Sequence, residues 1–228
     1  MSLTPWRVGG AQRQGRRHVQ ADGFVIGGHP ASGRIAVCVT DGIGDTVQAR
    51  EAAELVAHEA ATAMLTGTPE TGCMSARERL AASDLTTDAS IITALFDPDH
   101  SRIQIAWAGL CRAYALTTDD QLQRATYDHS LGERIRRHTH RRGALPQYDR
   151  KVSRTAARHE FVTTSLPTHA VRAVLLCTDG ISQVLVDSAI RRALMEPGPD
   201  QAAQLLANAV GIDNADNATA VVLRRDDD

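Results

Sequence analysis

The order of strand-like and helical segments limits the fold of this chain more than any other feature of its sequence. Eight short runs, rich in branched residues and bounded by turn residues, predict β-strands. These runs are Phe24–Ile26, Arg34–Thr40, Ser90–Phe96, Arg102–Trp107, Cys111–Leu116, Glu160–Thr164, Arg172–Thr178 and Ala218–Leu223.

Helical patterns stand at a few places between these runs. Apolar residues recur at helical spacing over Ala49–Met64, and the segment Ser75–Glu78 matches a capping box that predicts the start of a second helix. Asp187 and Asp200 are predicted N-caps of two late helices, and Gly211 is a predicted C-terminal stop.

These strands and helices do not alternate regularly, which argues against a doubly wound parallel sheet. We therefore expect an α+β fold of two antiparallel β-sheets flanked by helices, formed by a single domain over residues 1–228.

The net charge of -2 gives no overall field that would attract nucleic acid. The apolar runs are too short to cross a bilayer, and residues 1–7 contain no stretch typical of a signal peptide. We expect a cytoplasmic protein that binds neither nucleic acid nor membrane.

The cysteines predict neither a disulfide framework nor a zinc site. They are widely spaced and include no Cys-x-x-Cys pair. Cys38 and Cys177 fall within predicted strands, where a reduced cysteine acts as a small hydrophobic residue.

Two segments of the chain end alike. Ile35–Gly42 and Val174–Gly180 are both apolar runs that finish in Thr-Asp-Gly. A carboxylate at the end of a strand is held by the sheet and can face a cleft, and glycine allows the backbone a sharp turn or a close approach. One Asp-Gly after a strand is more often a simple turn. Two Thr-Asp-Gly segments that follow such similar apolar runs favour a functional role for Asp41 and Asp179.

Two further aspartates have comparable settings. Asp22 precedes the predicted strand Phe24–Ile26, and Asp216 precedes Ala218–Leu223. If all four carboxylates met at one end of the sheets, they would repel one another and raise one another's pKa values. A pair of divalent cations would remove this conflict. Because these motifs contain no His or Cys ligand, the oxygen donors favour Mg²⁺ or Mn²⁺ over Zn²⁺.

Six segments resemble, in order, the successive motifs of bacterial type-2C protein serine/threonine phosphatases. Each motif alone is a weak signal, but six in the right order over nearly the whole chain are a strong one. The segments are Gly15–Asp22, Val39–Gly44, Ala108–Tyr114, Tyr127–Leu131, Leu176–Gly180 and Asp216–Thr219.

The resemblance implies a four-layer sandwich, with two antiparallel sheets between layers of helices. It also implies a metal-ligand set. Asp41 would bridge two metal ions, and the backbone carbonyl of Gly42 would complete one site. Asp179 and Asp216 would bind one of the metals directly, while Asp22 would reach the cluster partly through water.

The resemblance further implies a phosphate-binding role for Arg17. This residue lies five positions before Asp22, where that family has its phosphate-binding arginine, and its planar fork suits two phosphate oxygens. Without the resemblance, Arg17 could be an exposed charge among Arg13, Arg16 and His18.

The implied activity is hydrolysis of phosphoserine and phosphothreonine in proteins by a water that two Mn²⁺ or Mg²⁺ ions activate. The expected partners are phosphorylated proteins, and a serine/threonine kinase or its targets are candidates among them.

Three positions depart from the family pattern. Ala21 stands where the family usually has an acidic or amide residue, and Leu110 replaces an aspartate that would bind a third metal. Asp45 places an additional carboxylate near the cluster. Because the two-metal ligands are retained, we expect a working but slow enzyme. The alternative is a phosphatase-like regulatory module with little or no turnover that binds metal or phosphoprotein.

The basic run Arg134–Arg142 belongs to a polar stretch, residues 131–155, that predicts a short helix followed by an exposed loop. The run contains no aromatic residues, which favours a solvated helix face over a nucleic-acid patch. It could instead recognise acidic or phosphorylated partner segments. His138 and His140 lie two positions apart, so a helix would not bring them together on one face as metal ligands.

Overall fold

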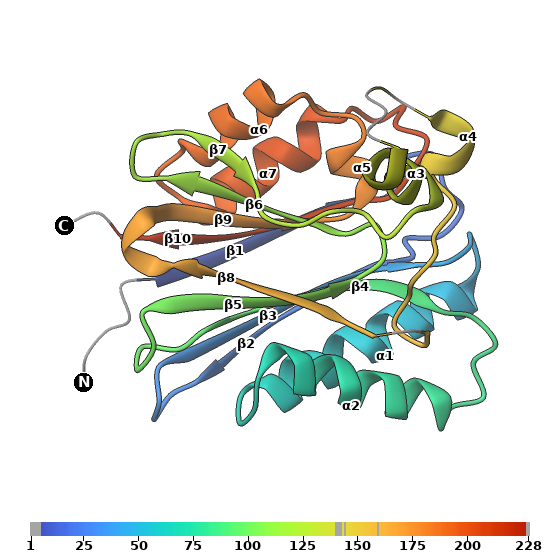
Figure 1. The fold of residues 1–228 in the computed structure, drawn as a ribbon, viewed down its shortest axis with the longest axis horizontal. Coiled ribbons are helices and arrows are strands. Elements are labelled where there is room, and N and C mark those ends of the chain that lie inside the picture. Colours follow the sequence, from blue (N-terminus) through green and yellow to red (C-terminus); the bar gives the residue numbers. More distant parts are fainter. Residues whose placement is uncertain (1–5, 140–142, 144, 159, 227–228) are drawn as a thin grey trace.

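The computed structural model describes residues 6–139, 143, 145–158 and 160–226. Two five-stranded antiparallel sheets pack face to face, with helices on both outer sides (Figure 1). This arrangement confirms the predicted α+β sandwich.

The first sheet contains both ends of the described chain and is covered by late helices. Across the sheet its strands are β1 (Trp6–Arg13), β10 (Ala218–Arg225), β9 (Val171–Cys177), β6 (Arg112–Thr117) and β7 (Leu122–Arg124). The helices α6 (Asp187–Leu194) and α7 (Pro199–Ala209) lie on its outer face, at the top of Figure 1. The short helix η1 (Thr168–Ala170) leads into β9.

The second sheet is covered by the two long early helices. Its strands, in order, are β2 (Asp22–His29), β3 (Arg34–Gly42), β4 (Ala89–Phe96), β5 (Arg102–Ala108) and β8 (Val162–Pro167). The helices α1 (Val47–Met64) and α2 (Pro69–Ala81) lie below it in Figure 1. Three short helices, α3 (Leu131–Thr139), α4 (Pro146–Asp149) and α5 (Asp179–Ser182), gather at one end of the sandwich.

Strand β3 shows why the central strands appear as continuous apolar runs. Its side chains alternate between two cores: Val37 and Val39 face the core between the sheets, while Ala36 and Cys38 face the core beneath α1 and α2. All four are fully buried. Both faces of the strand are therefore covered, and no polar alternation remains in the sequence.

Several helix starts differ from the prediction. The capping box that opens α2 is formed by Thr68 and Thr71, whereas Ser75 lies within the helix and donates a hydrogen bond to Glu59. The sequence match at Ser75–Glu78 was therefore wrong. The reason is that a Ser-x-x-Glu pattern is equally compatible with the middle of a helix.

The two predicted aspartate caps were also wrong, although both helices exist. The N-cap of α6 is Val186, so Asp187 is its first residue, and the N-cap of α7 is Gly198, so Asp200 is its second. A carboxylate in the first turn still interacts favourably with the positive end of the helix dipole.

In the stretch 131–155, the structure has the predicted short helix as α3, and adds α4. Residues 140–142 of the basic run lie outside the described residues. Among the helices that are described, none combines the length and apolar character needed to cross a membrane.

Candidate metal centre

Asp22 and Asp41 come together because they occupy paired positions on neighbouring strands. Asp22 is the first residue of β2, Asp41 is the last but one of β3, and the two are direct partners in the antiparallel register. Side chains at paired positions of an antiparallel ladder lie on the same face and close to each other. The register of this sheet therefore fixes the first half of the aspartate cluster.

The other two aspartates come from the first sheet. Asp179 opens α5 directly after β9, and Asp216 lies in the loop that leads into β10. Strands β9 and β10 pair with each other, so these two positions belong to the same end of that sheet.

Asp22 links the two sheets. Its Oδ2 accepts hydrogen bonds of 2.8 Å from the hydroxyls of Thr178 and Thr219. Thr178 directly precedes Asp179, and Thr219 is the second residue of β10. The side chain is only 5% exposed. These bonds hold the ends of the two sheets together at the cluster.

The glycines of both Thr-Asp-Gly motifs are required by close packing. A Cβ added to Gly42 would lie 2.3 Å from the backbone oxygen of Ala49, and one added to Gly180 would lie 1.8 Å from that of Asn217. Both glycines thus allow a neighbouring backbone to approach the segment that carries the aspartate. The motifs are not simple turns, because Gly42 ends a strand and Gly180 lies within a helix.

A hollow of about 160 Å³ opens at the cluster. Five of the six residues predicted for the site line it, and the sixth, Asp22, is buried beside Asp41 as its partner in the strand register. The predicted residues in the lining are Arg17, Asp41, Gly42, Asp179 and Asp216.

Burial and mutual repulsion raise the pKa values of three of these carboxylates, those of Asp22, Asp41 and Asp179. Burial, partly offset by the two threonine hydroxyls and reinforced by Asp179 and Asp216, raises the pKa of Asp22 to about 7. Burial and then the charge of Asp216 raise the pKa of Asp179 to about 6. The pKa of Asp41 is raised well above its usual value by burial, Asp179, Asp22 and Asp216. Such a cluster favours cations in the hollow.

The donor set fits Mg²⁺ or Mn²⁺, because all the candidate ligands are oxygens. Within the described residues, however, no group of three or more His, Cys, Asp or Glu side chains is already arranged around a point where a metal ion would sit. Three of the four carboxylates have other partners: Asp22 accepts its threonine hydroxyls, Asp179 accepts the side-chain amide of Gln183, and Asp216 is bound by Arg17. The four carboxylates lie at the same end of the sandwich, but their oxygens are not arranged around a common metal position.

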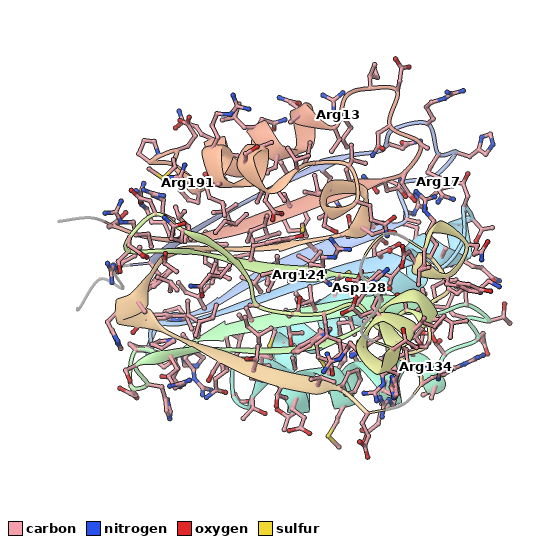
Figure 2. All side chains as sticks on the ribbon, turned by 45° about the horizontal axis from the view of Figure 1, so that its top comes forward. Arg13, Arg17, Arg124, Asp128, Arg134 and Arg191 are labelled. Carbon is pink, nitrogen blue, oxygen red and sulfur yellow. The ribbon has the colours of Figure 1, made fainter. Side chains whose placement is uncertain are left out.

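Arg17 makes a two-pronged contact with Asp216. Its Nε and Nη2 donate to Oδ1 and Oδ2 at 2.9 and 2.8 Å, and this contact raises the pKa of Arg17. The guanidinium fork predicted to bind phosphate thus holds a predicted metal ligand in this structure. Figure 2 shows Arg17 at the end of the molecule where the aspartates meet.

The three departures from the family pattern have clear places. Leu110 is buried and lines the hollow, so an aspartate at this position would face the cluster. Ala21 is buried and its N–H donates to the side chain of Asn217. Asp45 accepts the N–H groups of His18 and Val19, which lowers its pKa and fixes the loop next to Arg17.

Sequence reasoning missed several residues that support the centre. Thr178 and Thr219 bind Asp22, and Asn217 fastens the Asp216 loop to the backbone of residues 14 and 21. Arg150 lines the hollow, and its charge offsets part of the rise in the pKa of Asp179 that burial and Asp216 cause. The threonine of the second Thr-Asp-Gly motif was visible in the sequence, but nothing local connected Arg150 with the cluster.

Solved structures of bacterial phosphatases share this fold. The catalytic domain of the serine/threonine protein phosphatase PstP, solved with two manganese ions, superimposes with a TM-score of 0.80 at 22% identity, over 97% of this chain and 99% of that one. Stp1 from Staphylococcus aureus superimposes with a TM-score of 0.82 at 17% identity, over 100% of this chain and 98% of that one. PppA from Pseudomonas aeruginosa superimposes with a TM-score of 0.77 at 21% identity, over 98% of this chain and 99% of that one.

Sequence comparison alone finds no relative: no family model and no curated protein matches the chain. The structural likenesses, all at low identity, establish the fold, and at that level they confirm the resemblance indicated by the six motifs. The chain has the fold of the bacterial type-2C serine/threonine phosphatases.

Proposed function

We propose that this protein is a metal-dependent phosphatase that hydrolyses phosphoserine and phosphothreonine in proteins. The observation that carries the proposal is the meeting of four aspartates from both sheets at one end of the sandwich. Asp41, Asp179 and Asp216 line one hollow there, and the pKa values of Asp22, Asp41 and Asp179 are raised. Sequence motifs, fold and electrostatics all support the same site.

In this proposal Asp41, Asp179, Asp216 and the carbonyl of Gly42 would hold two Mn²⁺ or Mg²⁺ ions, and Asp22 would reach them partly through water. When bound, such ions activate a water for attack on phosphorus and neutralise charge on the phosphoryl group. The protein's own contribution is to fix these oxygens at the ends of rigid strands.

Arg17 would bind two oxygens of the phosphoryl group. This role requires its guanidinium to leave Asp216, which has to turn toward a metal at the same time. Both changes break the same partly exposed, two-pronged ion pair. Arg150 brings a second positive charge to the rim of the hollow, where an anionic substrate would enter.

The rival proposal is a phosphatase-like module that binds metal or phosphoprotein with little turnover. It is supported by Leu110, which offers no oxygen at a position that faces the cluster. We rank it second because the residues of the two-metal set are all present at one place.

Hydrolysis of a phosphothreonine peptide and of an aryl phosphate, with and without Mn²⁺, separates the two proposals. We expect turnover that needs Mn²⁺ or Mg²⁺ and that EDTA abolishes. Metal binding without turnover would favour the regulatory module, and full activity in EDTA would exclude the two-metal mechanism.

Substrates and setting also belong to the proposal. Phosphorylated proteins, among them a serine/threonine kinase or its targets, remain predicted partners. A cytoplasmic location and a single domain over residues 1–228 likewise remain predictions.

A further inference from the structure

A second hollow, of about 220 Å³, lies where α3 meets the strand-like segments before and after it. None of the six residues predicted for the metal centre lines it. Figure 2 shows Arg134, one of its residues, on α3. The side chains that matter for its chemistry are Tyr127, His129, Arg134, Arg137, His138 and Arg154.

The two acidic residues of this hollow are already neutralised. Asp128 is bound at 2.7 Å by both Arg112 and Arg124, and Figure 2 shows Arg124 beside it. Glu133 is bound at 3.1 Å by Arg136. All three of these arginines lie outside the lining. The charges of Asp128 and Glu133 are therefore not available to neutralise the arginines that line the hollow.

Three guanidinium groups of the lining have no carboxylate partner among the described residues. Arg137 lies over the ring of Tyr127, 4.0 Å from its centroid, and Arg154 donates a long hydrogen bond of 3.5 Å to a backbone oxygen. Arg134 is exposed. The hollow is consequently positive, in contrast to the acidic centre next to it.

His129 adds a donor without an acceptor. The side chain is 4% exposed, and its ring is stacked on Trp107 at 5.8 Å. Its Nδ1 accepts the N–H of Gly109 at 3.2 Å, so the hydrogen of the neutral ring is on Nε2. Burial, with the charges of Arg154 and Arg137, lowers the pKa of His129 to about 4, which keeps the ring neutral near pH 7. Nε2 has no hydrogen-bond partner within the described chain, an unfavourable state for a buried donor.

A groove between this hollow and the metal centre shares lining residues with both. Ser153 lines both this hollow and the groove, of about 690 Å³, and the groove shares Ile43, Arg150 and Val152 with the aspartate hollow. A protein segment bound at the centre can therefore follow the groove to the second hollow.

We propose that the hollow around His129, Arg134, Arg137 and Arg154 is a second oxyanion site, which binds a phosphoryl group of a phosphorylated protein segment. Guanidinium groups and an imidazole N–H are donors that suit phosphate oxygens. The binding of the anion does not depend on turnover, whereas the assignment of the anion to a phosphoprotein rests on the proposed function.

The test is calorimetric titration of the full chain in EDTA, where turnover is blocked. The probes are inorganic phosphate, a peptide with two phosphothreonines, its unphosphorylated twin, and single-stranded DNA. The variant Arg137→Gln/Arg154→Gln removes two charges from the hollow. Its matched control, Arg79→Gln/Arg192→Gln, removes two exposed charges from α2 and α6.

We expect phosphate and the phosphopeptide, but not the twin, to bind saturably, and the Arg137/Arg154 variant to bind them roughly tenfold or more weakly. The control should bind as the wild type does, and circular dichroism should show all variants folded. An absence of saturable binding, or an equal loss in the control, would overturn the site. Tighter binding of DNA than of phosphopeptide, lost in the same variant, would overturn its assignment to phosphoproteins. A protein without phosphatase activity that still binds phosphate here would refute only the proposed function.

Discussion

Asp22→Asn tests the electrostatics of the aspartate cluster in the metal-free protein. The carboxylate of Asp22 is buried, and one of its oxygens accepts both threonine hydroxyls. A carboxamide keeps an oxygen for those two hydrogen bonds but cannot ionise. The substitution therefore removes the charge with little change in packing.

The size of the effect follows from the pKa. Folding raises the pKa of Asp22 from 3.8 to about 7, so the folded state holds the proton more tightly than the unfolded state. The stabilisation from this group is complete below about pH 4 and is lost as the pH rises to about 7. Between about pH 5 and about pH 8, the linkage relation predicts that Asp22 alone lowers the free energy of unfolding by about 3 kcal/mol. For a chain of this length, that corresponds to roughly 6 to 12 °C in melting temperature.

Thermal and urea unfolding in EDTA, at constant ionic strength across this pH range, provide the assay. The wild type should lose stability as pH rises, and Asp22→Asn should lose about 3 kcal/mol less, so that it is the more stable protein at the alkaline end. Asp213→Asn, at an exposed position of the loop before β10, is the control and should follow the wild type. Equal pH slopes for the wild type and Asp22→Asn would refute the raised pKa and, with it, the unfavourable crowding of acids.

Four other substitutions test the site and the packing of its motifs. Asp41→Asn and Asp179→Asn should each reduce turnover by about a hundredfold or more and weaken Mn²⁺ binding while the fold persists; wild-type turnover at saturating metal would reduce both residues to structural roles. Leu110→Asp should raise turnover only at high Mn²⁺ concentration, since it adds an oxygen ligand facing the hollow; unchanged turnover, with no additional ion in a crystal, would show that Leu110 does not limit the enzyme. Gly180→Ala should destabilise the fold by about 3 kcal/mol or more because its Cβ overlaps a backbone oxygen, whereas a Cβ at Gly28 meets nothing within 4 Å and Gly28→Ala serves as the control. Equal melting temperatures for the two alanine variants would contradict the steric argument.

The strands that were predicted are mostly those buried on both faces, whose apolar runs need no partner to be recognised. Strand β1 was missed because its middle is Gly9-Gly10, which has low intrinsic strand propensity. It forms because it pairs with β10 along its whole length, and because α7 approaches Gly9 so closely that a Cβ there would lie 2.3 Å from the backbone nitrogen of Asp200. Both causes are contacts between opposite ends of the chain, which local patterns cannot show.

The same distinction applies to the candidate site. The positions of Asp41 and Asp179 were predictable, because each comes at the end of an apolar run and precedes a glycine. The ion pair between Arg17 and Asp216, and the bonds from Thr178 and Thr219 to Asp22, were not predictable, because they join residues 156 to 199 positions apart. A motif identifies a ligand, but the partners that orient the ligand come from the packing of the two sheets.

The placement of the cluster explains how the fold can tolerate it. The three hydrophobic cores lie between and outside the sheets and contain none of the four aspartates. The acids occupy only the end of the sandwich, where the sheets meet through Asp22 and where Arg17 and Arg150 supply the positive charges that line the hollow. Electrostatic strain is therefore concentrated at one end, and hydrophobic stabilisation is spread over the rest of the molecule. A cation bound in the hollow would relieve this strain without disturbing any core. We therefore expect its binding to change mainly the pH dependence of stability and to leave the sheets almost unchanged.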